Sequence, residues 1–250
     1  QLKGYTDKDG ISAYDEIRKS GGNPDNLIVE RNYIKNAFGF IEMHIEQGPV
    51  LKERDTDIGI VGHIAAPYRL RITVEGTAAH SGACPMGSRR DALTGAAEVI
   101  LAVEQLGRQY ADQRIVATVG KCNVVNGAIN IVPGKVELYV DIRGIDSDVI
   151  AEVVTRLHEE MNRIAAERNL QIEPATLSQE QPVKLNDDMG ELLVEQCVPN
   201  MLTFLHMVSG AGHDTMYMAG LTRAALYFVP CEGAISHNKA EAVLDSDVQN

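Results

Sequence analysis

Basic residues are in short supply in this sequence, and the shortage limits the classes of partner. The chain has 23 Lys and Arg against 35 Asp and Glu, which gives a formal net charge of -12 at pH 7. Nucleic acids and anionic membrane surfaces are bound through basic faces, so we expect neither as the main partner. An acidic balance otherwise favours solubility.

Cysteine pairs and long apolar runs are also missing. The four cysteines, Cys84, Cys122, Cys197 and Cys231, form no CxxC pair, and no secretory hydrophobic region opens the sequence. Both absences favour a reduced, cytoplasmic setting. No apolar run approaches the roughly 18 residues that a membrane-spanning helix needs. We therefore expect a cytoplasmic protein that does not enter a membrane.

Internal repeats, low-complexity tracts and phosphate-binding glycine loops are absent as well. The glycines of Gly210-Ala211-Gly212 have neither GxGxxG spacing nor a following lysine. What is present is an ordinary globular composition, with 44% hydrophobic residues in a chain of 250. This is enough for a sizeable core, in one large domain or two modest ones.

The stretch from residue 39 to 51 carries the first functional signal. Apolar residues alternate there with Glu42, His44 and Glu46, and the pattern breaks at Gly48-Pro49. Alternation predicts a strand with the three ionisable groups on one face. Carboxylate oxygen and neutral imidazole nitrogen are usual ligands of Zn and Mn, so this face suits a cation. A solvated strand face is the alternative.

Four stretches resemble, in the same order, the motifs of a known family. Residues 40–51 read FIEMHIEQGPVL, which is similar to the HIEQGP motif of M20-type metal-dependent amidohydrolases. The branch includes N-carbamoyl-L-amino-acid hydrolases, allantoate and ureidoglycolate amidohydrolases and β-ureidopropionase. The other stretches are GTAAHSG and its continuation at 76–92, NIVPG to DIR at 130–143, and SGAGHD to ISH at 209–237. Four ordered motifs identify the sequence as a member of this family, which one motif would not do.

The resemblance also implies that the chain is a fragment. The sequence opens at Gln1 without a methionine, and its first helical segment, residues 10–17, lies well inside the proteins of the family. The preceding portion of those proteins carries a bridging aspartate, a further histidine, a glutamate ligand and the glutamate that acts as general base. We therefore expect this chain by itself to be inactive.

From Tyr68 onward the hydrophobic pattern becomes regular. It predicts a strand at 69–74, a helix at 91–106, strands at 114–121 and 135–143, a helix that starts after Asp146-Ser147, and a strand at 170–177. This is the split βαβ order, in which two helices cover one face of a four-stranded antiparallel sheet. The predicted buried stripes are Ala92, Leu93, Ala96, Ala97, Ile100 and Val103, then Val149, Ile150, Val153, Val154, Leu157, Met161 and Ile164.

The pattern after residue 181 is again α/β. Helices are predicted at 191–198 and 215–219, and strands at 203–208 and 224–229. The resemblance implies an α/β protein in which residues 1–66 and 181–250 form part of an M20-type catalytic domain. Residues 67–180 are the inserted ferredoxin-like (βαββαβ) lid, with Pro67 at the boundary. The same resemblance implies a homodimer formed through the lid.

His44 and His237 are the metal ligands that the resemblance implies. The family binds two divalent ions, Zn or Mn with Co or Ni also compatible, which lower the pKa of a bridging water and polarise the scissile carbonyl. A histidine after a strand, such as His237, is otherwise more often a surface residue. The assignment requires positions 44 and 237 to converge on one pocket across the inserted lid.

His80 is the catalytic residue that the resemblance implies. It lies in a Gly- and Ala-rich loop that another surface can approach closely. In the family this histidine binds the substrate carbonyl and stabilises its oxyanion, commonly at the partner subunit's site. The alternative is a histidine that caps the helix beginning near residue 91.

The other substrate-binding residues also follow from the resemblance. Arg143 is expected to bind the substrate carboxylate, for which a planar guanidinium is suited, although a structural Asp141–Arg143 pair is the alternative. Asn130 and Gln47 match the Asn and Gln of the family that contact the substrate. Gly210 and Ala211 match a backbone loop at the carboxylate, while the roles of His213 and Asp214 stay open; His213 also suits a buried, hydrogen-bonded structural position.

The predicted activity is hydrolysis of a linear amide or ureido bond in a small substrate that bears a carboxylate. The carbamoyl branch is favoured because HIEQGP and NIVPG occur together. An M20-type peptidase or aminoacylase is one alternative. A non-catalytic module that dimerises or binds carboxylates is the other, because the base and several ligands are not found in these 250 residues.

Overall fold

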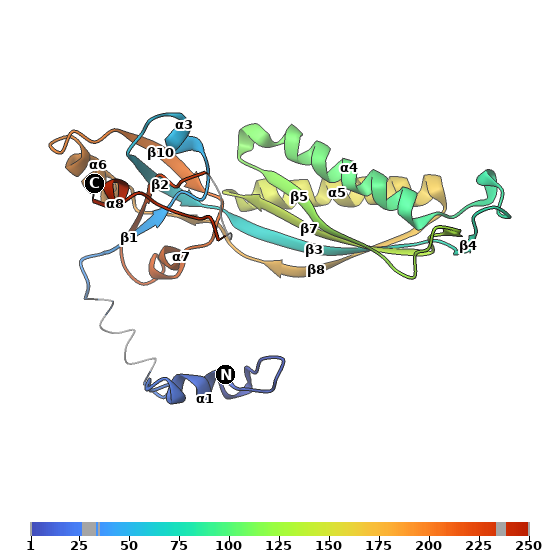
Figure 1. The fold of residues 1–250 in the computed structure, drawn as a ribbon, viewed down its shortest axis with the longest axis horizontal. Helices are drawn as coiled ribbons and strands as arrows, with labels where there is room; N and C mark the ends of the chain where they lie inside the picture. Colours follow the sequence, from blue (N-terminus) through green and yellow to red (C-terminus); the bar gives the residue numbers. More distant parts are fainter. Residues whose placement is uncertain (1, 27–33, 35, 234–238, 250) are drawn as a thin grey trace. The chain divides into compact units, whose positions relative to one another are not determined.

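The structure, a computed structural model, describes residues 2–26, 34, 36–233 and 239–249, and the chain divides into two compact units (Figure 1). Residues 61–184 and 205–213 form the unit that we call the lid unit. Residues up to 60, 185–204 and from 214 onward form the unit that we call the base unit.

The lid unit has the order of elements that the periodicity predicts. It contains β3 (Ala66–Glu75), α4 (Ala92–Gln109), β5 (Val116–Val124), β7 (Lys135–Gly144), α5 (Ser147–Arg168) and β8 (Gln171–Gln179). The sheet order is β5-β7-β3-β8, and each neighbouring pair is antiparallel. This is the βαββαβ arrangement of a ferredoxin-like fold, so the prediction for this part is confirmed.

An aspartate caps the N-terminus of each long helix. Asp91 accepts from the backbone N–H of Leu93 at 2.9 Å, and Asp146 accepts from the backbone N–H of Asp148 at 2.8 Å. These bonds satisfy N–H groups that have no partner inside the helix, which is worth about 1 kcal/mol per cap. Both helices therefore start where an acidic residue precedes an apolar periodic run.

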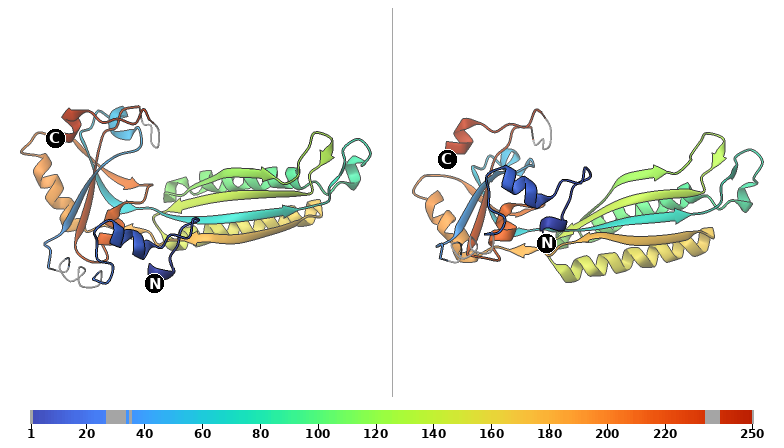
Figure 2. Two further views of the ribbon diagram at one scale, coloured as in Figure 1. Left: turned by 60° about the horizontal axis from the view of Figure 1, so that its bottom comes forward. Right: turned by 90° about the horizontal axis from the view of Figure 1, so that it is seen from below.

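Both helices cover the same face of the lid sheet (Figure 2). The predicted stripe of α5 is buried from Ile150 to Ile164. The predicted stripe of α4 is wrong at Leu93 and Ala97, which are exposed. The buried residues of α4 are Ala92, Gly95, Ala96, Val99, Ala102, Val103 and Leu106. Because apolar residues surround much of α4, its periodicity did not select one face, and packing against the sheet and α5 did.

Strand β7 shows how this core orients the polar side chains. Val136, Leu138, Val140 and Ile142 point toward the helices, and each is at most 2% exposed. Fully burying one such side chain contributes about 1.5–3 kcal/mol, and a register slip of one residue would expose all four. The alternate residues, including Asp141 and Arg143, are thereby placed on the sheet face opposite the helices.

A two-stranded ribbon in the lid unit was not predicted. It pairs β4 (Ala79–His80) with β6 (Ile131–Val132), antiparallel, so that His80 lies opposite Ile131. The backbone N–H of Ser81 also donates to the carbonyl oxygen of Asn130 at 3.0 Å. Each strand has two residues, too few for periodicity to reveal.

The base unit contains the paired strands β1 (Phe40–Ile45) and β11 (Ala224–Val229), which run parallel. The sheet to which they belong has the order β1-β11-β2-β10, with β2 (Ile58–Ile64), β10 (Phe204–Ser209) and β9 (Val183–Lys184) paired to β2. Helix α6 (Asp187–Cys197) contributes Cys197 to a buried cluster with Ile58, Ile60 and Val229. The predicted strand at 224–229 is confirmed at both ends.

The remaining elements are short. They are η1 (Leu2–Gly4), α1 (Ala13–Lys19), α3 (Val50–Glu53), η2 (Met86–Ser88), η3 (Ala111–Gln113), α7 (Asp214–Met218) and α8 (Asp245–Gln249). None of the helices in the described ranges combines the length and the apolar character that a membrane crossing requires.

Candidate active site

The two carboxylates that flank His44 serve as helix caps. Glu46 lies just beyond the end of β1, and its carboxylate accepts from the backbone N–H groups of Val50 at 2.8 Å and Leu51 at 2.7 Å. The carboxylate of Glu42 accepts from the backbone N–H of Thr215 at 2.8 Å and from its hydroxyl. The prediction that all three ionisable groups lie on one strand fails by one residue at Glu46, because β1 ends at Ile45, although the Glu46 N–H still donates to the carbonyl oxygen of Val229 at 3.0 Å.

His44 is held in one tautomer by its own backbone. Its Nδ1 lies 2.8 Å from the carbonyl oxygen of Ile45, at the C-terminal end of β1. A carbonyl oxygen only accepts, so Nδ1 carries the proton and the lone pair is on Nε2. This is the form in which a histidine ligates a metal through Nε2 while a backbone carbonyl orients the ring.

Gln47 has an unusual backbone conformation. Its φ is 59°, in the left-handed region that residues other than glycine seldom adopt. Such a conformation costs of order 1–3 kcal/mol, and residues that hold it cluster at functional sites. The turn that follows β1 is therefore a candidate part of a functional site.

The loop after β1 adjoins the loop after β11. Cys231 is fully buried and its thiol donates to the carbonyl oxygen of Gly48 at 3.5 Å. Lys52 of α3 forms an ion pair with Glu232. The C-terminal ends of parallel strands meet at one edge of a sheet, which is where α/β proteins place their ligand sites.

The second predicted metal ligand, His237, lies outside the described residues, because 234–238 are not among them. Within the described ranges, no three His, Cys, Asp or Glu side chains are grouped so that they would hold a metal ion. The described residues therefore fit a metal site only in part, through the ligand tautomer of His44.

His80 is held in the opposite tautomer. The backbone N–H of Gly82 donates to His80 Nδ1 at 3.1 Å. An accepting Nδ1 has no proton, so the neutral ring carries its proton on Nε2 and presents an N–H donor there. The alternative that His80 caps the following helix is wrong, because Asp91 occupies the cap of α4.

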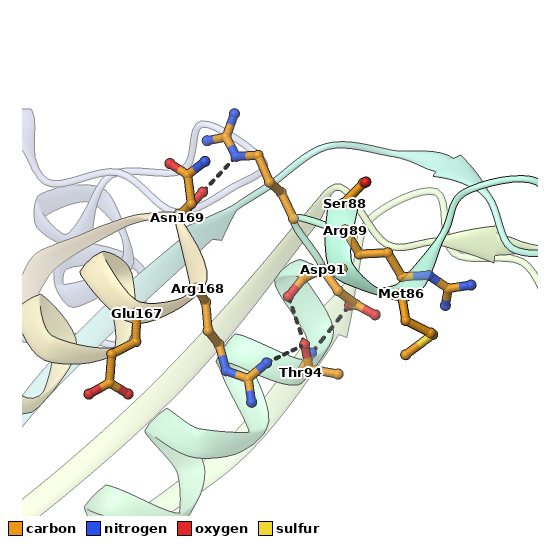
Figure 3. Close-up of a pocket in the computed structure, with 10 residues that line it drawn as sticks. Met86, Ser88, Arg89, Asp91, Thr94, Glu167, Arg168 and Asn169 are labelled. Atoms are coloured by element: carbon orange, nitrogen blue, oxygen red, sulfur yellow. Dashed lines mark hydrogen bonds between the residues drawn. The ribbon is translucent and has the colours of Figure 1, made fainter.

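Arg89 stabilises the loop that follows His80. Its guanidinium donates to the carbonyl oxygens of Ser81 at 2.6 Å and Cys84 at 3.2 Å. A cavity of about 470 Å³ lies beside this segment, and Figure 3 shows Arg89 and Arg168 extending from it in different directions. Arg168 donates to the Thr94 hydroxyl at 3.2 Å. Both arginines donate to protein groups and thereby stabilise the lid unit. Their guanidinium groups do not converge on the cavity as a basic binding site.

Arg143 belongs to a cluster of charged side chains on the face of the lid sheet that the helices do not cover. Its Nε and Nη2 donate to the two carboxylate oxygens of Asp141 at 2.7 and 3.1 Å, so the structural pair predicted as an alternative forms. Arg69, opposite Asp141 on β3, donates to the same carboxylate at 3.0 Å. The Nη1 of Arg143 donates to the carbonyl oxygen of Gly210 at 2.6 Å.

Asp141 makes the stability of this cluster depend on pH. Burial raises the pKa of its carboxyl, but the hydrogen bonds from Arg143 and Arg69 outweigh burial and hold that pKa below its usual range. A depressed carboxyl pKa contributes stability above the unfolded value, about 3.9 for aspartate, and the contribution is lost as the pH falls through the folded value.

We therefore expect Asp141→Asn to lower the unfolding temperature at pH 6 and to have a shrinking effect below about pH 4. The measurement is the unfolding temperature of both proteins from pH 3 to pH 7. A difference that stays constant across this range would contradict the assignment of the stabilising charge to Asp141.

Gly210 and Ala211 belong to a tight loop at the end of β10. The hydroxyl of Ser209, the last residue of the strand, accepts from the backbone N–H of Ala211 at 3.1 Å and lies 3.0 Å from the carbonyl oxygen of Ala211. The same hydroxyl is 2.6 Å from His213 Nε2. His213 is 5% exposed, so it has the buried, hydrogen-bonded character that the sequence left as one option.

Comparison with known proteins agrees with this arrangement. A family model for the M20 peptidase dimerisation domain matches residues 68–169. The allantoate deiminase of Arabidopsis thaliana is 33% identical over 97% of this chain and 51% of its own length. The N-carbamoyl-L-amino-acid amidohydrolase of Pseudomonas sp. is 33% identical over 94% of this chain and 57% of its own length.

A solved structure extends the likeness to three dimensions. The amidase of the hydantoinase/carbamoylase family from Burkholderia multivorans has a TM-score of 0.86 and is 32% identical, covering 97% of this chain and 58% of that chain. The chain contains an M20-type dimerisation domain and is similar to M20-type amidohydrolases over nearly all of its length. It spans between about half and three fifths of the length of these relatives.

The predicted site residues of this M20-type chain form three groups, and the two in the lid unit lie at opposite ends of β7, where Lys135 pairs with Glu75 near the ribbon and Arg143 pairs with Pro67. In the base unit, His44 and Gln47 lie at the end of β1. In the lid unit, His80 and Asn130 adjoin on the ribbon, and Arg143 contacts the loop of Gly210.

Three residues of this M20-type chain that the sequence did not single out contact a predicted residue or a neighbour of one. They are Arg69 at Asp141, Arg89 at the loop after His80, and Ser209 at Ala211. Arg89 was present in a quoted motif and Arg69 in an alternating strand. Their partners depend on strand register and loop closure, which the local sequence does not specify.

Proposed function

We propose that the protein is a metal-dependent amidohydrolase that cleaves a linear C–N bond in a small ureido or N-carbamoyl carboxylate. N-carbamoyl-L-amino acids and allantoate are the substrates that we favour. The observation that carries the proposal is the likeness to an N-carbamoyl-L-amino-acid amidohydrolase over 94% of this chain. The tautomers of His44 and His80 and the hydrogen bonds of Arg143 support it.

Arg143 and the loop of Gly210 and Ala211 bind the substrate carboxylate in this proposal. Three of the five guanidinium N–H groups of Arg143 are engaged by Asp141 and Gly210. One N–H on Nη1 and one on Nη2 are left, which is the number that a bidentate carboxylate uses. Asp141 orients the guanidinium and raises the pKa of Arg143, so the group stays charged.

His80 acts on the scissile carbonyl of a substrate bound by the partner subunit, because His80 and Arg143 of one chain lie at opposite ends of the lid sheet. Its Nε2–H donor is oriented by the bond from Gly82 to Nδ1, and it suits an oxygen on which negative charge develops. Asn130 lies beside it on the ribbon and supplies a carboxamide to the same substrate. Both residues belong to the region that matches a dimerisation domain, and we propose that this region forms a homodimer.

In this proposal His44 would hold a metal ion through Nε2, and His237 would be the second ligand. A divalent ion at this edge would supply a water of lowered pKa and polarise the substrate carbonyl. The adjoining loops after β1 and β11 support convergence, because residues 48–52 contact residues 231–232. Gln47, with its left-handed backbone, contacts the carbamoyl or amide group.

The test is an assay of the protein expressed from its entire coding sequence. N-carbamoyl-L-amino acids, allantoate, ureidoglycolate, N-acetyl amino acids and dipeptides are each incubated with the protein in Zn, Mn, Co or Ni. We expect ammonia release from at least one ureido substrate, loss of at least about 100-fold in rate after chelation, and recovery with one of these ions.

Two other results would redirect the proposal. Hydrolysis of N-acetyl amino acids or dipeptides without any ureido substrate would indicate an aminoacylase or peptidase. Failure to hydrolyse any of the substrates with any of the ions would leave a binding module, and isothermal titration with an N-carbamoyl amino acid would test that role. Activity that survives complete chelation would refute the metal dependence.

A further inference from the structure

The buried pair Ser209 and His213 has no assigned role in the proposed function. Ser209 is 1% exposed and His213 is 5% exposed, and both lie in the lid unit. Their side chains meet at 2.6 Å between Ser209 Oγ and His213 Nε2. Burying two polar side chains is costly unless they are hydrogen-bonded, so their position calls for a physical reason.

One proton arrangement satisfies all three contacts of the Ser209 hydroxyl. A hydroxyl donates once and accepts twice. It accepts from the Ala211 N–H at 3.1 Å, donates to the Ala211 carbonyl oxygen at 3.0 Å, and accepts from a protonated His213 Nε2 at 2.6 Å. The His213 imidazole therefore donates to the remaining lone pair of the Ser209 hydroxyl. The same hydroxyl binds both the N–H and the carbonyl oxygen of Ala211.

The loop has little else to hold it at its tip. Apart from its two chain neighbours, no heavy atom of the described residues would lie within 4 Å of a Cβ added at Gly210, so their packing does not restrain this residue. The carbonyl oxygen of Gly210 nevertheless accepts from Arg143 Nη1 at 2.6 Å. Its direction is thus set by the hydrogen bonds of Ser209 on one side and by Arg143 on the other.

A nucleophilic serine is the competing interpretation of a Ser–His contact at this distance. A substrate cannot reach the Ser209 hydroxyl, however, because Ser209 is 1% exposed and its lone pairs accept from Ala211 and His213. A substrate carbonyl would have to displace those bonds to reach the oxygen. The burial favours a structural use of the pair.

We propose that Ser209 and His213 are positioning residues for recognition of the substrate carboxylate. They hold Gly210 and Ala211 in the conformation in which the Gly210 carbonyl oxygen accepts from Arg143. This fixes the orientation of the guanidinium N–H groups that bind the substrate carboxylate. This inference rests on the proposed function for its consequence, while the bracing of the loop is a property of the lid unit alone.

The first variant is Ser209→Ala, and Ser178→Ala is its matched control. The Ser178 hydroxyl lies in the same unit, is buried and has no hydrogen-bond partner among the described residues, so its removal deletes the same atom without breaking a bond seen there. The second variant is His213→Gln, which removes the imidazole and keeps the bond between Ser209 and the Ala211 N–H. All are made in the protein expressed from its entire coding sequence.

Two measurements are made on each variant. For the best ureido substrate, we expect Ser209→Ala to raise KM by at least about 10-fold with kcat changed less than about 3-fold, because carboxylate binding is lost more than catalysis. His213→Gln should change KM in the same direction by less, and Ser178→Ala should not change it. Hydrogen exchange over residues 209–213 should accelerate in Ser209→Ala and not in Ser178→Ala.

The exchange measurement separates this inference from the proposed function. Equal exchange in Ser209→Ala and Ser178→Ala overturns the bracing whether or not the protein is active. A fall in kcat with unchanged KM also overturns it, because a general loss of structure or a catalytic role would then account for the pair. If the unaltered protein hydrolyses no substrate, the proposed function fails, and exchange alone decides whether the pair braces the loop.

Discussion

Replacing His80 with alanine is expected to reduce kcat for the ureido substrate by about 100- to 1000-fold, the usual effect of removing one oxyanion donor. The bond from the Gly82 N–H to Nδ1 places the ring proton on Nε2, so the wild-type side chain offers a donor without any rearrangement. Arg89 fixes the loop that supplies this bond. The loss should therefore appear in kcat.

The controls for His80 use the same chemistry elsewhere in the lid unit. His158→Ala removes an imidazole on α5 whose Nε2 has no hydrogen-bond partner in the described part of the chain. It should leave kcat within about 2-fold of the wild type, as do most changes away from a site. His80→Gln retains an N–H donor and should recover part of the loss. Because His80 is exposed, its replacement should leave the unfolding temperature unchanged. An unchanged kcat in His80→Ala would remove this residue from the mechanism.

Gly76→Ala is expected to destabilise the lid unit by about 3 kcal/mol or more, at the upper end of the range for overpacking. A Cβ at this position would lie 1.9 Å from the carbonyl oxygen of Arg90 and 2.8 Å from its carbonyl carbon. That carbonyl accepts the Thr77 N–H at 2.8 Å, and the Gly76 N–H donates to the Gly134 carbonyl oxygen at 2.9 Å. Backbone hydrogen bonds to Arg90 and Gly134 hold this position on both sides, so the added methyl group cannot be accommodated by a small shift. The backbone just before the ribbon of His80 would have to move.

The unfolding temperature measured by calorimetry tests this expectation. A loss of this size corresponds to a decrease of roughly 6–12 °C in a protein of this size. Gly120→Ala is the matched control, since a Cβ there has open space around it and should change the unfolding temperature by less than about 2 °C. Similar shifts in the two variants would show that the close approach at Gly76 is relieved at little cost.

The elements of the lid unit were predictable because their signals are local. Asp91 and Asp146 each precede an apolar run with helical period, and β7 alternates along its whole length, so element type and order follow from neighbouring residues. Prediction failed at the stripe of α4, where Leu93 is exposed. A helix with apolar residues on most sides does not reveal which side faces the sheet.

Around the candidate site, the sequence indicated one contact within a strand and none of the contacts between elements. Local alternation placed Asp141 and Arg143 on one face of a strand, and the pair forms there. Nothing local indicated that Arg69 would lie opposite Asp141, because that depends on the register between two strands distant in the sequence. The use of Glu46 as a helix cap was equally hidden, since it depends on how the chain turns after β1.

The sequence by itself determined which side chains are available, the order of the helices and strands, and the family, because periodicity and motifs are properties of neighbouring residues. Only the tertiary structure decided the proton positions on His44 and His80 and the alignment of Arg143 with Gly210. Those features depend on which backbone carbonyl or N–H group lies within hydrogen-bonding distance. That distance is set by strand register and loop closure, after the apolar faces have been buried.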